Sequence, residues 1–181
     1  MQATVLRLLT EWLKGSTGGV LTKLKAMTSA TVLDKDGDAR PLSVGFIGNE
    51  SEDEEVAQGY DPPSLPAIYV TEDGPMAMAG EVTTTYRDTL PGQGMPVAIR
   101  VVQEDFDTVA AVQARGYLLR AIMQSLEDWL ANGNEASRTR SGVQVMWADT
   151  FTMGPWEEEL GSARVTAAIV VNLQLRDTEV T

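Results

Sequence analysis

The sequence predicts an α+β fold: an antiparallel or mixed β-sheet with a long central helix and an N-terminal helix packed on one face. Three observations predict it. Apolar residues repeat with a helical period at the start of the chain and again over residues 108–131, and residues 165–176 alternate apolar and polar side chains. The length of 181 residues favours one domain over two. We therefore expect residues 1–181 to form a single domain.

The composition excludes several classes of active site. The chain has no cysteine and no histidine, which removes cysteine nucleophiles, serine–histidine triads, disulfides and the usual zinc sites. A formal net charge of −12 should make the chain repel a nucleic-acid backbone. The sequence has neither a bilayer-spanning stretch nor a signal-peptide pattern. We expect no cofactor, no metal and no membrane association.

The N-terminal part is expected to contain helices and a hairpin. The apolar side chains of the opening segment fall on one face of a helix that Gly15 ends: Val5, Leu8, Leu9, Trp12 and Leu13. Residues 20–27 form either a second short helix or the lead-in to a strand. Residues 29–33 and 42–47 are rich in β-formers and flank an Asp-Gly turn, which predicts a hairpin.

The middle of the chain is expected to alternate loops and strands. Residues 48–66 should form a loop, because acidic residues crowd at 50–55 and prolines follow them. Residues 67–71, 81–86 and 97–102 are strand candidates, and the last two are expected to pair.

The longest helix is expected over residues 108–131, followed by a strand at 143–148 and the final strand at 165–176. The helix contains Gly116, which costs about 1 kcal/mol relative to alanine, so we expect a close contact with the sheet there. A long excursion, residues 149–163, should separate the last two strands. The predicted core joins two apolar stripes, from the helix and from the last strand: Leu119, Ile122 and Leu126 against Ile169, Val171 and Leu173.

Carboxylate chemistry is the catalytic class that this composition leaves open, as a glycosidase pair or a magnesium site. The candidates are Glu104, Asp105 and Asp107 at a strand-to-helix junction, and residues 157–159, three glutamates. Acids at a helix N-terminus stabilise the helix without any catalytic role, and a glutamate run is typical of a solvated face. No basic partner or substrate motif accompanies either group, so we do not expect an enzyme.

Aromatic residues gather around the last pair of strands. Trp147 is interpreted as a core residue, whereas Trp156 follows a Gly-Pro pair and precedes three glutamates on a loop. A loop tryptophan beside charge serves either as an interface anchor or in local packing. Phe151 and Trp156 are therefore candidate residues for an interface with another protein subunit.

Three stretches of the chain resemble the tail terminator family of long-tailed bacteriophages. They are residues 81–107, the helix around residues 116–121, and residues 168–175, whose sequences include Tyr86-Arg87-Asp88, Pro96-Val97-Ala98-Ile99-Arg100-Val101-Val102, Gly116-Tyr117-Leu118-Leu119-Arg120-Ala121 and Ala168-Ile169-Val170-Val171-Asn172-Leu173-Gln174-Leu175. The resemblance covers roughly 100 residues and is a pattern match without a signature motif. The loop at 48–66 is longer than the family leads us to expect, which leaves its role open.

The resemblance implies a structural virion protein. Subunits of this family form a ring, expected here to be a homohexamer, at the head-proximal end of the tail, where they end tube polymerisation and join the tail to the head neck. The implied partners are further copies of the chain, the tail tube protein and a head–tail stopper or connector protein. DNA passes through the channel without specific binding. The implied location is the head–tail junction of the virion, after assembly in the host cytoplasm.

The acidic run has two interpretations. The channel of this family is often acidic, so the resemblance makes Glu52, Asp53, Glu54 and Glu55 candidate channel-lining residues. A run of like charges is also typical of a solvated surface loop. Three other functions stay open: another neck protein such as a stopper or adaptor, a carboxylate-dependent hydrolase, and a monomeric binding module with the acidic loop as its ligand patch.

Overall fold

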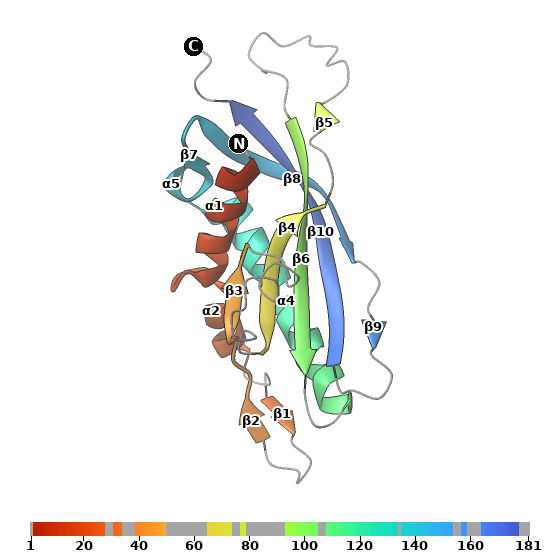
Figure 1. The fold of residues 1–181 in the computed structure, drawn as a ribbon. Coiled ribbons are helices and arrows are strands. Elements are labelled where there is room, and N and C mark those ends of the chain that lie inside the picture. Colours follow the sequence, from red (N-terminus) through yellow and green to blue (C-terminus); the bar gives the residue numbers. More distant parts are fainter. Residues whose placement is uncertain are drawn as a thin grey trace, which may run out of the picture.

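The computed structural model describes residues 2–27, 31–33, 39–49, 65–73, 77–78, 93–104, 108–133, 135–153, 157–158 and 164–177. Figure 1 shows a curled sheet whose long central strands run beside a long helix, with the N-terminal helix nearby. The predicted α+β class is therefore confirmed, together with its N-terminal and long helices.

The helices form where apolar residues repeat with a helical period. They are α1 (Gln2–Lys14), α2 (Val20–Ala26), α4 (Thr108–Asn132) and the short α5 (Glu135–Arg138). The α1 helix buries Val5, Leu8, Leu9 and Leu13 as predicted, and Gly15 follows its end. Residues 20–26 are helical, which decides between the two alternatives that the sequence left open.

Among the described residues, eight strands form one mixed sheet. Six of them lie in the order β3 (Phe46–Gly48), β4 (Ala67–Glu72), β6 (Gln93–Glu104), β10 (Arg164–Asp177), β8 (Val143–Met153) and β7 (Thr139–Arg140). The short strands β5 (Ala77–Met78) and β9 (Glu157–Glu158) pair with β6 and β10 respectively. Within the described part, β3 and β4 run parallel, and the other neighbours are antiparallel.

The centre of the sheet is the ladder between β6 and β10, which pair from Glu104 opposite Arg164 to Gln93 opposite Leu175. Alternate side chains of both strands are buried on the side of the helices: Met95, Val97, Ile99 and Val101, and Ala167, Ile169, Val171, Leu173 and Leu175. The strands predicted at 97–102 and 165–176 are confirmed, and so is the alternation of the last one.

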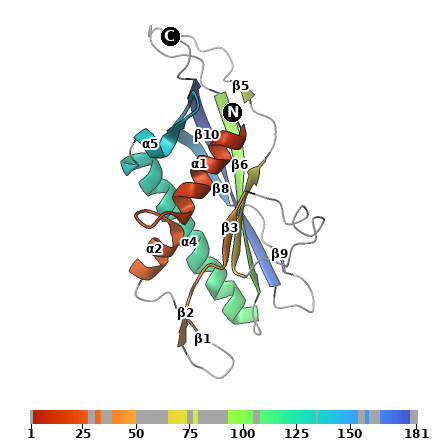
Figure 2. The ribbon, with the colours of Figure 1, turned by 60° about the vertical axis from the view of Figure 1, so that its left-hand side comes forward.

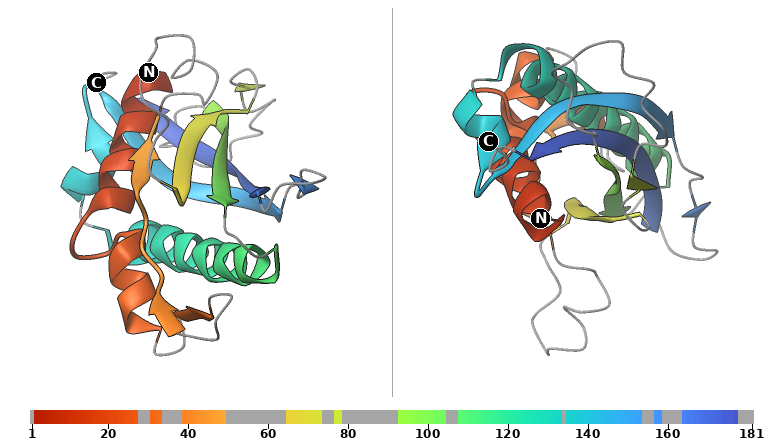
Figure 3. Two further views of the ribbon diagram at one scale, coloured as in Figure 1. Left: turned by 60° about the horizontal axis from the view of Figure 1, so that its bottom comes forward. Right: turned by 90° about the horizontal axis from the view of Figure 1, so that it is seen from above.

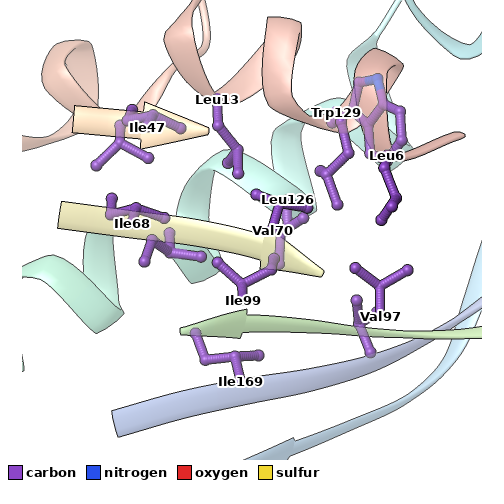
Figure 4. Packing of buried hydrophobic residues seen from close by; sticks show 14 of the residues in the cluster. Leu6, Leu13, Ile47, Ile68, Val70, Val97, Ile99, Leu126, Trp129 and Ile169 are labelled. Carbon is purple, nitrogen blue, oxygen red and sulfur yellow. The ribbon is translucent and has the colours of Figure 1, made fainter. Parts of the chain in front are cut away.

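The helices and the sheet share one buried cluster. Figure 4 shows side chains of α1, α4 and the strands turned towards one another, among them Leu13, Leu126 and Ile99. The predicted helix and strand stripes both belong to this cluster: Leu119, Ile122, Leu126, Ile169, Val171 and Leu173. Because the α4 helix packs on β6 and β10, the predicted pairing of the two stripes agrees with the structure.

The N-terminal helix lies where the curled sheet opens. It packs against β3 and β4 near one edge and against β7 and β8 near the other. Figure 2 shows α1, α2 and α4 gathered on the same side of the strands. In Figure 3, seen from above, α1 lies between β4 and the β7 end of the sheet. The α1 helix therefore joins the two edges of the sheet on its helical side.

The hairpin is present, but its second strand was predicted at the wrong position. The paired strands are β1 (Thr31–Leu33) and β2 (Ala39–Pro41), and residues 42–45 lie in no strand. Residues 46–48 form β3 and pair in parallel with β4. The backbone N–H of Gly45 donates to the carbonyl of Pro66 at 2.9 Å, and Ile47 is buried in the core. Residues 46–48 therefore pair with β4 in the main sheet and are not part of the hairpin.

The excursion predicted from residue 149 begins later than expected. The strand β8 continues to Met153 and stays paired with β10. Its register shifts twice, between Val171 and Leu173 and between Gln174 and Leu175 of β10. Such bulges interrupt the period of two by which a strand is found in a sequence. The strand predicted at 81–86, and with it the pairing to 97–102, lies outside the described residues.

The prediction of a close contact between Gly116 and the sheet is wrong. Gly116 is exposed, and a Cβ built on it would meet nothing within 4 Å. The buried face of α4 is rotated towards Ala111, Ala114 and Leu118, which are almost fully covered. Alanines therefore provide the small residues of this face, and the glycine points to solvent.

Candidate interaction surface

The helical side of the molecule is closed by polar contacts between α4 and the turn after α1. The indole Nε1 of Trp12 donates to the carbonyl of Ser125 at 2.8 Å, and the buried Ser125 hydroxyl donates to the carbonyl of Gly18 at 2.7 Å. A Cβ at Gly18 would lie 2.8 Å from Cη2 of Trp12 and closer still to Cζ2. The turn is therefore fixed by packing as well as by hydrogen bonds.

Three ion pairs lie on the same side of the molecule. Both guanidinium Nη atoms of Arg140 lie 2.9 Å from the Glu11 carboxylate, and Arg7 Nε is 3.0 Å from it. The hydrogen bond from Arg140, helped by Arg7, lowers the pKa of Glu11 against the opposing effect of burial. Lys23 Nζ lies 2.9 Å from Asp128, whose pKa is lowered by hydrogen bonds from Asn132 and Lys23. These groups hold α1 to β7 and α2 to α4.

A surface hollow of about 290 Å³ lies beside these contacts. It is lined by the end of α1, the following turn and α5, including Leu8, Trp12, Ala136 and Ser137. Its ionisable side chain, Glu11, is already bidentate with Arg140. The hollow thus offers a shallow surface beside a structural ion pair.

The opposite side of the sheet has a different character. We define the outer sheet face as the half-buried residues of β4, β6 and β10 that point away from the helices: Thr71, Pro96, Ala98, Thr166, Ala168, Val170, Asn172 and Gln174. None of these side chains is charged, in a chain whose formal net charge is −12. The registers align Thr71, Ala98 and Val170 in one row, which the exposed Thr152 of β8 extends.

Charged and aromatic residues border this face. Arg100 is exposed within the face, where it pairs with Tyr69 on one side and Ala168 on the other, and Arg176 is exposed at one end. On the same side of the sheet, next to Arg100, the rings of Phe46 and Tyr69 lie with their centroids 5.5 Å apart in a small buried cluster that includes Val102. The defined residues of the outer sheet face thus include no acidic side chain, and one arginine, Arg100, stands among them; interfaces are depleted in aspartate and glutamate and enriched in arginine.

The β8 strand adds an open edge to this face. The β7 strand pairs with β8 at Val143 and Gln144, and β10 pairs with its other side as far as Met153. Within the described part of the chain, no strand pairs with the outer edge of residues 145–153. Arg138 approaches this edge near its start, where its Nη1 lies 3.5 Å from the carbonyl of Met146.

The structure places one of the predicted interface residues on this edge strand. Phe151 lies in β8, opposite Val171 of β10, and so belongs to the sheet where a loop was expected. Trp156 and the acidic residues Glu52, Asp53, Glu54 and Glu55 lie outside the described residues. Their proposed roles stay predictions.

The predicted carboxylate groups are partly described. Glu104 ends β6 opposite Arg164, and Glu158 lies in β9 opposite Val165, so the two acids stand on strands that flank the start of β10. Asp105, Asp107 and Glu159 lie outside the described residues. Among the residues that the structure describes, no three acidic side chains gather in a way that could hold a metal ion.

The outer sheet face was not predicted from the sequence, although a signal for it was present. The even positions of the final strand, from Thr166 to Gln174, contain no charge, whereas 22% of the whole chain is charged. A helix that is long and apolar enough to cross a membrane does not occur in the described part of the chain.

Comparison with known proteins finds no matching family model and no matching curated protein.

Proposed function

We propose that this chain is a structural subunit of a homo-oligomeric ring, and that the ring ends tube polymerisation at the head-proximal end of a phage tail. The observation that carries the proposal is the outer sheet face, whose defined residues include no acidic side chain. This face matters because each copy of the chain carries a formal net charge of −12.

Electrostatics explains why this face matters. Copies with a large charge of one sign repel one another, so they associate stably where their surfaces lack that charge. The cores of protein interfaces are depleted in aspartate, glutamate and lysine. The row of Thr71, Ala98, Val170 and Thr152 meets this requirement across four neighbouring strands.

The tail role rests on the resemblance to tail terminators. Much of the resembling sequence lies in elements at the centre of the fold, namely β6, α4 and β10. In this role the partners are the tail tube protein and a stopper or connector protein, and the location is the head–tail junction. Phe151 and Trp156 contact a neighbour or the tube, and the acids at 52–55 line the channel through which DNA passes.

Self-association is tested by adding one charge to the outer sheet face. Val170→Glu puts a carboxylate at the centre of the row and should dissociate the ring while the circular dichroism of the subunit is unchanged. The matched control is Leu21→Glu, because Leu21 is 38% exposed on α2 and the substitution adds the same charge. Light scattering should show small species for the first variant and intact rings for the second. Intact rings with Val170→Glu would contradict the use of this face.

The tail role has its own test. Rings added to polymerising tail tube protein of the same phage should arrest elongation, and electron microscopy should show them at one tube end. Tubes that elongate equally with and without rings would contradict a terminator function. A variant with lysine at residues 52–55 should bind DNA in a salt-sensitive way if these residues line the channel.

A further inference from the structure

We propose that the outer edge of β8, residues 145–153, binds a β-strand from a second copy of the chain, so that the sheet continues across the subunit boundary. The identity of the partner as a second copy rests on the proposed function. The open edge itself is a property of the described sheet.

The backbone of this edge is suited to pairing with a further strand. In an antiparallel ladder, alternate N–H and C=O groups of a strand point away from its neighbour. The β7 strand covers β8 only at Val143 and Gln144 within the described chain, so these groups of residues 145–153 have no ladder partner there, although the Met146 carbonyl has a side-chain contact with Nη1 of Arg138 at 3.5 Å. At about 3.3 Å per residue this edge is roughly 30 Å long. A row of backbone donors and acceptors of this length is satisfied by the addition of another strand.

The sequence of the edge contains neither of two residues that commonly protect an edge strand, so its two bulges are the protective device that the described strand carries. Edge strands of monomeric proteins are commonly interrupted by lysine or proline. Residues 145–153 contain neither, and Asp149 is their one charged residue. The two bulges in β8 leave extra backbone groups unpaired by β10 and increase the local twist. A partner strand must match that twist, which favours a partner of defined geometry.

The distribution of charge on the surface favours a second copy of the chain as that partner. Negatively charged copies approach most easily along a surface without acidic residues, and the β8 edge adjoins the outer sheet face, whose defined residues include none, through Thr152 and Val170. Thr152 is exposed, so a strand added here would extend the row of the outer sheet face into the neighbour. If β8 paired with β8 of a second copy, the assembly would be complete with two subunits. A ring of more subunits requires that β8 pairs with a different strand of the next copy.

Hydrogen exchange on the full-length protein tests the pairing directly. Backbone amides of residues 145–153 should exchange at least about tenfold more slowly in the oligomer than in the subunit dissociated by dilution. The amides of β10, which lie between two strands in either state, provide the internal reference. Equal exchange of the β8 amides in the two states would overturn the inference.

A single lysine supplies the second test. Thr152→Lys places an ammonium group on the exposed position of the edge and should raise the dissociation concentration of the oligomer by about tenfold or more. Ala3→Lys is the control, because it adds the same charge at an exposed position of α1. Both variants reduce the net negative charge equally, so general repulsion cannot explain a difference between them. Assembly of Thr152→Lys like wild type would overturn the inference.

The outcomes separate this inference from the proposed function. A ring with an unprotected β8 edge overturns strand addition and leaves the ring in place. A two-subunit assembly with a protected edge supports strand addition and overturns the ring. A chain that is monomeric at every concentration overturns both.

Discussion

Replacing Gly18 with alanine perturbs the turn between α1 and α2 at a point where the structure has no space for a methyl group. The added Cβ would lie 2.8 Å from Cη2 of Trp12, whose ring is held by the hydrogen bond from Nε1 to the carbonyl of Ser125. The ring and the turn must therefore separate. That movement strains the Trp12 bond and the bond from the Ser125 hydroxyl to the Gly18 carbonyl.

The magnitude follows from these two effects. Overpacking a well-packed site costs about 1–3 kcal/mol, and each weakened buried hydrogen bond adds about 0.5–1.5 kcal/mol. We expect a loss of about 2–6 kcal/mol in the free energy of unfolding. In a chain of 181 residues 1 kcal/mol corresponds to about 2–4 °C, so Tm should fall by about 4–24 °C.

The matched control is Gly116→Ala in α4. The same chemical change meets open space there, because a Cβ would have no neighbour within 4 Å. It should raise stability by about 1 kcal/mol through helix propensity alone. Thermal unfolding followed by circular dichroism and tryptophan fluorescence compares the two variants. A Gly18→Ala protein that is as stable as wild type would refute the packing described for this turn.

Two further predictions concern the core and the charges of α1. Leu126→Ala should lose about 2–5 kcal/mol in urea unfolding, because Leu126 is fully buried, whereas Leu21→Ala at an exposed position should stay within about 0.5 kcal/mol of wild type; similar losses would contradict the core. Arg140 and Arg7 lower the pKa of Glu11, so this carboxylate contributes stability that is present above its unfolded pKa of about 4.3 and is lost as the pH falls through the lower folded value. Glu11→Gln should therefore lose less stability than wild type on acidification below about pH 4, and identical pH profiles would contradict the ion pair.

Periodicity explains which parts of the fold could be predicted. The α1 helix, the α4 helix and β10 each carry a regular apolar pattern over more than ten residues, so their positions follow from the sequence. The rotation of α4 about its own axis did not follow from the sequence. Its many alanines and its glycine are all small, and hydrophobic periodicity alone did not show that Ala114 is buried and Gly116 exposed.

The other differences arise from tertiary contacts. The β8 strand contains two bulges, which break its alternation, so its second half looked like a loop. Residues 46–48 pair with a strand that lies about twenty residues further along the chain, and local turn signals favoured the hairpin instead. The open edge of β8 had no sequence signal, because it depends on which strands lie beside it.

The mass of the wild-type chain in solution tests the central claim most directly. Native mass spectrometry and light scattering across a range of protein concentrations should show a closed species of about six times 19.6 kDa, in equilibrium with the subunit on dilution. A species of 19.6 kDa at every concentration would contradict the account.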